Sequence, residues 1–209
     1  MVAPRIFEQA RTRYEWNERA QRYVDARTRR FVSGEAIRDA LNEVIDIAKE
    51  RIDADSLALQ QGTISLAEWQ TRMAQHTKQI HIVSAASARG GWAQMTPADW
   101  GATGGALKRQ FAFLQNFALD IQRGVQKLGG NFIRRARMYG NAARRTYENI
   151  KRRASQAAGN TEERRVLGVA DHCPDCVEFA GRGWQPIGTL PPIGDSVCKV
   201  NCRCLFEFR

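Results

Sequence analysis

All five cysteines of this chain of 209 residues lie between positions 173 and 204. Cys173 and Cys176 form a C-x2-C pair in the segment DHCPDC, and the other three lie in CKVNCRC, at positions 198, 202 and 204. Cysteines crowded in this way hold a metal ion, form disulfides, or provide a reactive thiolate. The spacing must therefore be tested against each of these three chemistries.

The spacing favours a structural zinc site. Two cysteines three positions apart can chelate one ion through a tight turn, and a second pair completes the tetrahedron of thiolates that zinc prefers. In an extended strand, Cys202 and Cys204 would point to the same side and could both reach the ion. Five cysteines compete for four positions, so Cys198 can replace either of them, and the adjacent His172 is a further possible ligand. The predicted ligands are drawn from Cys173, Cys176, Cys198, Cys202 and Cys204. Buried reduced thiols, or a disulfide formed late in the life of the protein, remain the alternative.

The composition is that of an ordinary globular protein, with 43% hydrophobic and 26% charged residues. The first residues, MVAPRIFEQARTR, lack the apolar core of a secretory signal. No run approaches the roughly 18 apolar residues that would predict a membrane-spanning helix, so no membrane partner is expected. We therefore expect folding in a reducing cytoplasm, where clustered cysteines hold metal more often than they form disulfides.

Sequence motifs of zinc enzymes are missing. There is no H-E-x-x-H helix, and no H-x-E precedes the cysteines as it would in a zinc deaminase. His76 and His81 are five residues apart, which separates them by about 140° around a helix. No cysteine stands apart from the cluster as a nucleophile would. We therefore expect no catalytic residues and no enzymatic activity.

Most of the chain has the periodicity of amphipathic helices. Apolar residues recur three and four positions apart from Ile37 to Ile52, and again from Leu66 to Ile80. Ser65 and Thr96 are expected N-caps, each followed by residue types of a first helical turn. A further helical region is predicted from residue 107 to 158, interrupted at 127–131 by KLGGN. Its apolar stripe comprises Phe111, Leu114, Phe117, Ala118 and Ile121.

Two other segments are less regular. The aromatic and apolar residues between Tyr14 and Phe31 are also expected to lie on a helix. The glycines between positions 90 and 105, together with two tryptophans, predict a close-packed turn between helical layers. The segment GRGWQPIGTLPPIGDS has four glycines and three prolines and predicts loops and short strands. The expected fold is therefore mainly α, with a multi-helix body over 1–158 and a cysteine-rich C-terminal module of loops and short strands over 159–209.

Positive charge is concentrated in one segment. The net charge is +10, and residues 108–165 contain 14 Lys and Arg against 4 Asp and Glu. Three arginine pairs recur at spacings close to whole helical turns, at Arg134, Arg135, Arg144, Arg145, Arg152 and Arg153. Glu148 is the only acidic residue between 121 and 161, so this basic strip is expected to lack local counter-charge. It predicts non-specific contact with DNA or with an acidic protein face, and the interleaved Tyr139 and Tyr147 are expected to pack between helices.

The C-terminal region resembles the phage head-morphogenesis family, the minor head proteins similar to phage Mu F protein. The resemblance covers roughly residues 139–204 and includes YGNAARRTYENIKRR, EERRVLGVADHCPDC and CKVNCRC. The residues that match the family pattern are Asp171, Cys173, Cys176, Asn201, Cys202, Arg203 and Cys204. Many members carry a histidine where this chain has Lys199, and Cys198 lies one place earlier.

The resemblance implies a structural role in the virion head. Members are low-copy components associated with the portal and needed for head assembly or DNA delivery. The expected partners are the portal protein, the major capsid protein, or both, and packaged DNA. The expected location is the head of the virion, after synthesis in the host cytoplasm. The alternative reading of the residues is a free, zinc-stapled protein that binds nucleic acid.

Overall fold

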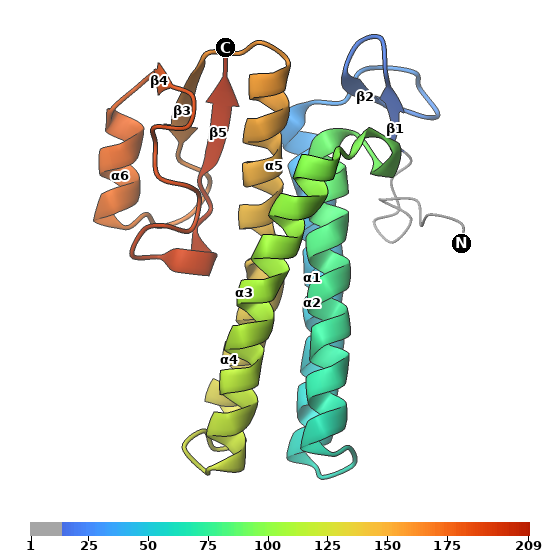
Figure 1. The fold of residues 1–209 in the computed structure, drawn as a ribbon, viewed down its shortest axis with the longest axis vertical. Coiled ribbons are helices and arrows are strands. Elements are labelled where there is room, and N and C mark those ends of the chain that lie inside the picture. Colours follow the sequence, from blue (N-terminus) through green and yellow to red (C-terminus); the bar gives the residue numbers. More distant parts are fainter. Residues whose placement is uncertain (1–13) are drawn as a thin grey trace.

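The computed structural model describes residues 14–209. The expectation that residues 1–13 do not form a secretory signal lies outside this range. The mainly α fold is confirmed: long helices form an elongated bundle, and short strands lie at its two flanks (Figure 1). The helices are α1 (Gly34–Gln60), α2 (Leu66–Arg89), α3 (Pro97–Gln122), α4 (Gly130–Asn141), α5 (Ala143–Ala157) and α6 (Pro174–Gly181), with 3-10 turns η1 (Trp92–Gln94) and η2 (Lys199–Asn201). The strands are β1 (Tyr14–Asn17), β2 (Arg22–Asp25), β3 (Glu162–Val166), β4 (Gln185–Pro186) and β5 (Leu205–Phe208).

The helices α1 and α2 form a hairpin, and each begins at a serine N-cap, of which Ser65 was predicted. The Ser33 hydroxyl accepts a hydrogen bond from the Ala36 amide, and the Ser65 hydroxyl accepts one from the Glu68 amide, both at 3.1 Å. These bonds satisfy amides that the first helical turn leaves without partners. The predicted apolar stripe of α1 is buried from Ile37 to Ile52. Helix α2 packs against α1, α3 and α5, while α4 packs against α1.

The core at the lower end of the bundle is aromatic. Trp69 is fully buried, and its ring makes an edge contact with Phe117 at a centroid distance of 5.3 Å. Its indole nitrogen donates to the Ser56 hydroxyl at 3.2 Å, so burial leaves this polar group satisfied. Tyr139 stacks on Phe117, and Tyr147 is buried between α1 and α2 in the upper core. The prediction that both tyrosines pack between helices is confirmed.

Helix α3 corrects the prediction of a turn in the glycine-rich segment. The connection between α2 and α3 covers only residues 90–96, and α3 begins at Pro97 and continues through Gly101, Gly104 and Gly105. A capping box stabilises its start: the Thr96 hydroxyl accepts from the Asp99 amide, and the Asp99 carboxylate accepts from the Thr96 amide. The cap, together with the packing of buried side chains farther along the helix, outweighs the helix-forming penalty of each glycine, which is about 1 kcal/mol.

The apolar stripe predicted for this helix is only partly buried. Leu114, Phe117 and Ala118 are in the core, but the Phe111 side chain is 37% exposed. Trp100 and Phe113 of α3 are also exposed. The predicted break at KLGGN is confirmed, since α3 ends at Gln122 and α4 begins at Gly130.

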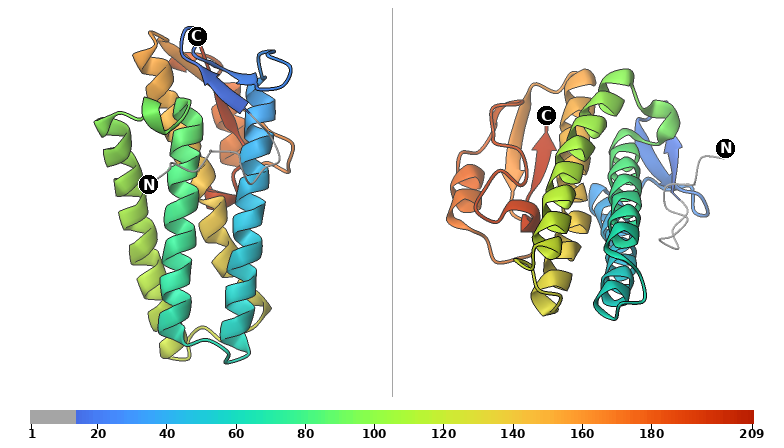
Figure 2. Two further views of the ribbon diagram at one scale, coloured as in Figure 1. Left: turned by 90° about the vertical axis from the view of Figure 1, so that its right-hand side faces the viewer. Right: turned by 60° about the horizontal axis from the view of Figure 1, so that its bottom comes forward.

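The expectation of a helix between Tyr14 and Phe31 is wrong. Strands β1 and β2 form an antiparallel hairpin in which Trp16 pairs with Tyr23. The two rings make an edge contact at 5.0 Å, and Trp16 lies against Gly90, where a β-carbon would collide with the indole. The hairpin therefore covers the end of the α1–α2 pair (Figure 2). This long-range packing, and not the local pattern, decides its conformation.

The C-terminal module contains a three-stranded sheet in the order β4-β3-β5, with antiparallel pairs. It lies against α5, on the side of the bundle opposite the hairpin (Figures 1 and 2). Two side chains of α5 hold the backbone of Phe206: its amide donates to Glu148, and its carbonyl accepts from Lys151, both at 3.2 Å. These bonds occupy the free edge of β5, which would otherwise present unpaired backbone groups.

The predicted boundary coincides with a change of secondary structure. Helix α5 ends at Ala157, and β3 begins at Glu162. The module has an apolar cluster of its own, which includes Leu190, Ile193 and Phe206. Whether residues 1–158 fold without the module stays a prediction. Within residues 14–209, none of the helices has the length and apolar character needed to cross a membrane.

Candidate metal centre

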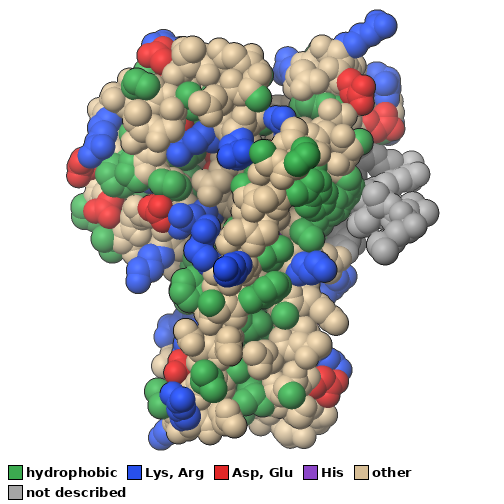
Figure 3. Space-filling model, in the orientation of Figure 1, with side chains coloured by type: hydrophobic (Ala, Val, Ile, Leu, Met, Phe, Trp, Pro, Cys, Tyr) green, Lys and Arg blue, Asp and Glu red, His purple; other side chains and the backbone are tan. Residues whose placement is uncertain are grey.

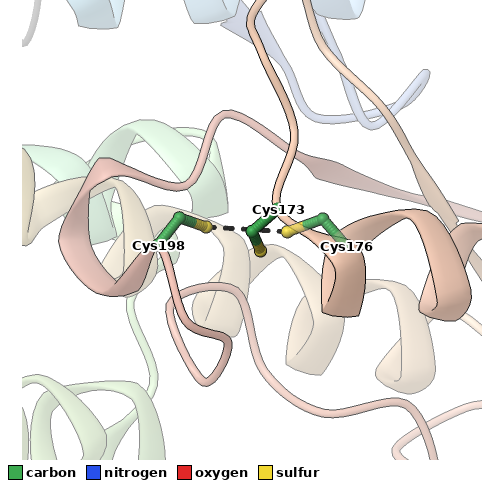
Figure 4. Close-up of side chains that lie close together, drawn as sticks. All are labelled: Cys173, Cys176 and Cys198. Carbon is green, nitrogen blue, oxygen red and sulfur yellow. Dashed lines mark hydrogen bonds between the residues drawn. The ribbon is translucent and has the colours of Figure 1, made fainter.

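The five cysteines come together beside α5. Cys173 is the N-cap of α6, Cys176 lies in its first turn, and Pro174 occupies the first helical position between them. Cys198 precedes the η2 turn, Cys202 follows it, and Cys204 immediately precedes β5. Figure 4 shows that the side chains of Cys173, Cys176 and Cys198 point toward one another from α6 and from the loop before η2. The loop from β4 to η2 thus brings Cys198 back to the C-x2-C pair of Cys173 and Cys176.

Cys176 is the common member of two sulfur triads. Its sulfur lies within 4.8 Å of those of Cys173 and Cys198, and within the same distance of those of Cys202 and Cys204. The Cys176 sulfur is 3.6 Å from that of Cys198 and 3.7 Å from that of Cys202. In a tetrahedron with metal–sulfur bonds of about 2.3 Å, the sulfurs are about 3.8 Å apart. Among the described residues, three thiolates at a time therefore fit around one ion, in either triad. The complete tetrahedron of four thiolates stays a prediction.

Cys204 differs from the other cysteines in its surroundings. Its sulfur lies 3.8 Å from Nδ1 of His172, whose Nε2 is 2.7 Å from the Gly168 carbonyl. A carbonyl can only accept, so Nε2 carries the proton and Nδ1 presents its lone pair to Cys204. Histidines that hold metals donate the second ring nitrogen in the same way. His172 is thus positioned beside the site, although it belongs to neither sulfur triad.

The thiols differ in their tendency to ionise. A hydrogen bond from Cys204 is the main cause that lowers the pKa of Cys202, to about 4, and the same bond raises the pKa of Cys204. Burial raises the pKa of Cys173, but the amides of Cys176 and Cys198 outweigh burial and bring it to about 7. Burial raises the pKa of Cys198 to about 12. Two thiols thus favour the anionic form and two retain their protons, and a divalent cation would stabilise all of them as thiolates.

A buried arginine lies against the sulfur cluster. Arg165 of β3 is 2% exposed, and its Nη1 donates to the Cys176 sulfur at 3.9 Å. Nη2 donates to the carbonyls of Pro191 and Pro192, and the guanidinium lies over the rings of Phe179 and Phe206. Within residues 14–209 no carboxylate forms an ion pair with it. A buried charge requires partners, and the carbonyls of Pro191 and Pro192 and the Cys176 sulfur accept its hydrogen bonds.

Arg165 was not among the predicted site residues, because in the sequence it contributes only to the net charge of the basic segment. The signal lies in the alternation of β3: Glu163 and Arg165 are buried, whereas Arg164 is exposed. Glu163 forms an ion pair with Arg152 at 2.7 Å and accepts from the Leu190 amide at 3.1 Å. The inner face of this strand is therefore charged, and its charges face α5 and the cysteines.

The basic strip does not lack counter-charge, which corrects that prediction. Four of the six arginines form ion pairs with carboxylates from other parts of the chain. These pairs are Arg135–Asp120 at 2.8 Å, Arg145–Asp195, Arg152–Glu163 at 2.7 Å and Arg153–Asp99 at 3.5 Å. Arg134 donates to Asn131, and Arg144 donates to Asn42 and Asn141. All four carboxylates lie outside residues 121–161, so the composition of the strip itself does not reveal them.

Arg145 and Arg152 instead attach the C-terminal module to α5, since Asp195 and Glu163 both belong to the module. A contact of the strip with DNA or with a protein partner stays a prediction.

Comparisons with protein-family models, with curated proteins and with solved structures found no match.

Proposed function

We propose that this chain is a structural minor head protein of a tailed phage, with zinc holding its C-terminal module. The observation that carries the proposal is the cluster of five thiols next to the buried Arg165, formed by the segments that resemble the head-morphogenesis family. Four sulfurs around a zinc ion leave no position for water or substrate, so the ion is structural and not catalytic. The proposal assigns no enzymatic activity.

A role in the head requires a surface for protein partners. On one side of α3, Trp100 (41%) and Phe111 (37%) are exposed, and a β-carbon at Gly104 would meet no atom within 4 Å. Aromatic residues are enriched in the interfaces of proteins, so this side of α3 is the proposed contact surface. The portal protein or the major capsid protein is the proposed partner for this face, at the portal vertex or in the head interior.

The experiment is the purification of heads from cells that produce the phage with a tagged copy of this chain. The chain should remain with the heads through a density gradient, and Phe111→Ser should reduce its incorporation. Val125→Ser is the matched control, because Val125 is 75% exposed but lies beyond the end of α3. Heads that form normally and never contain the chain would contradict the proposal.

A free, zinc-stapled protein that binds nucleic acid is the second candidate. Lys and Arg side chains gather beside the middle of α3, where the C-terminal module adjoins the bundle (Figure 3). This candidate predicts tight binding of DNA by the isolated chain, with an affinity that falls steeply as salt increases. The internal ion pairs of the strip arginines weaken this candidate relative to a protein contact.

A further inference from the structure

A cavity of about 300 Å³ lies between α3, α5 and the loop that contains η2. Four cationic side chains line it: Arg109, Arg144, Arg145 and Lys199. None of its lining residues is an aspartate or a glutamate within the described chain. The cavity is separate from the space between the sulfurs, although Cys202 borders it.

Two buried nitrogens at this cavity are left without a hydrogen-bond partner. His81 is 1% exposed and lines the cavity, its Nδ1 is 2.7 Å from the Thr146 hydroxyl, and its Nε2 has no partner in the described structure. The Nε of Arg145 is also buried and unpartnered. Buried polar atoms are almost always hydrogen-bonded, so these two atoms indicate a missing polar ligand.

The positive charges around the cavity are only partly balanced. Asp195 pairs with Arg145, but the hydrogen-bond partners of Arg144 are the neutral side chains of Asn42 and Asn141. Burial, reinforced by the nearby Arg203, lowers the pKa of Arg144 to about 10. An anion in the cavity would offset the repulsion between Arg144 and Arg203 and the free-energy cost of burying the Arg144 guanidinium. Arginine and lysine are the residues that bind phosphate groups in proteins.

The remaining wall is apolar or carries side-chain amides. Phe113 of α3 lines the cavity, and its side chain is 58% exposed. Val200 of η2 and Ile193 of the preceding loop also line it. Gln110 and Asn149 contribute amides. The volume is at the lower limit of typical ligand pockets, about 300 Å³. An aromatic ring, amides and a cationic cluster in this space suit a planar base joined to a phosphate.

We propose that this cavity binds a phosphate monoester of the size of one nucleotide. The same chemistry occurs in a free nucleoside monophosphate and at the 5′-phosphorylated end of a DNA strand. The inference does not depend on a role in the head, because it rests on the cavity alone.

The test is isothermal titration calorimetry of deoxyadenosine monophosphate into the full-length chain. We expect saturable binding at one site, and no comparable binding of deoxyadenosine, which lacks the phosphate. Arg109→Ala should weaken the binding about tenfold to a hundredfold, the effect of one lost charged hydrogen bond. Lys108→Ala is the matched control, because it removes the same charge from the neighbouring, exposed residue that does not line the cavity.

Three results would overturn the proposal: no saturable binding, equal binding of deoxyadenosine, or equal weakening by Lys108→Ala. The source of the phosphate is then decided by competition with two trinucleotides that differ only at the 5′ end. Displacement by the 5′-phosphorylated form alone identifies the end of a strand, and displacement by neither identifies a free nucleotide. Equal displacement by the 5′-hydroxyl form would show binding of internal phosphodiesters and would contradict a monoester site.

Discussion

Replacement of Arg165 by methionine tests whether the sulfur cluster is anionic. Methionine keeps apolar contact with Phe179 and Phe206 but removes the charge that lies 3.9 Å from the Cys176 sulfur. For two unit charges at about 4 Å and an effective dielectric constant of about 20, Coulomb's law gives about 4 kcal/mol. The burial cost of the guanidinium offsets part of this energy. We therefore expect Arg165→Met to lower zinc affinity about tenfold to a hundredfold, as for other residues that contact a metal ligand.

The assay is competition for zinc between the purified chain and a chromophoric chelator, at fixed pH and under reducing conditions. Arg164→Met is the matched control, because Arg164 is the neighbouring residue of β3, is exposed, and pairs with Glu207 at 2.6 Å. It should leave zinc affinity unchanged. Circular dichroism should show the same helical content for both variants. Equal affinities for Arg165→Met, Arg164→Met and the parent chain would refute the reasoning.

Three further outcomes are expected. Burial, reinforced by Arg109, lowers the pKa of His81 from 6.5 to about 4. Between these two pH values His81 is protonated in the unfolded chain but neutral in the folded chain. The free energy of unfolding should therefore decline by up to about 3 kcal/mol between pH 6.5 and 4, and urea titrations of His81→Asn should show a shallower decline. Gly168→Ala places a β-carbon against the Arg203 carbonyl, so melting curves should show a loss of about 1–3 kcal/mol, whereas Gly181→Ala, which meets no atom within 4 Å, should not destabilise the chain. Trp69→Ala empties the lower core and should cost about 3–5 kcal/mol in chemical denaturation; a cost below 1 kcal/mol would contradict the central packing of this ring.

The helices were predictable because their evidence is local. The stripe from Ile37 to Ile52 and the caps at Ser65 and Thr96 lie within a few turns of the residues they organise. The hairpin at Tyr14 was not predictable in this way, since its strands are only four residues long and depend on packing against Gly90. The glycines of α3 were misleading because capping and distant packing outweigh their poor helix propensity.

In the candidate site, too, the features with local evidence were predictable and those set by distant residues were not. The C-x2-C spacing predicted which residues gather, and the other four sulfurs all lie within 4.8 Å of that of Cys176. The charges around them were not predictable from local counts. Asp195 reaches Arg145 across 50 positions of sequence, and Arg165 is buried only because β3 turns that face toward the cysteines. Tertiary partners of charged residues require the fold, because any carboxylate in the chain is a possible partner.

The most direct test of the central claim is the metal content of the full-length chain. The protein should be purified under reducing conditions without added metal and measured by inductively coupled plasma and native mass spectrometry. The account predicts about one zinc ion per chain. Its removal by a chelator should increase hydrogen exchange over residues 159–209 while α1 and α2 keep their protection. A metal-free chain with five titratable thiols, and with equally slow exchange in the C-terminal module, would contradict the claim that zinc holds this module together.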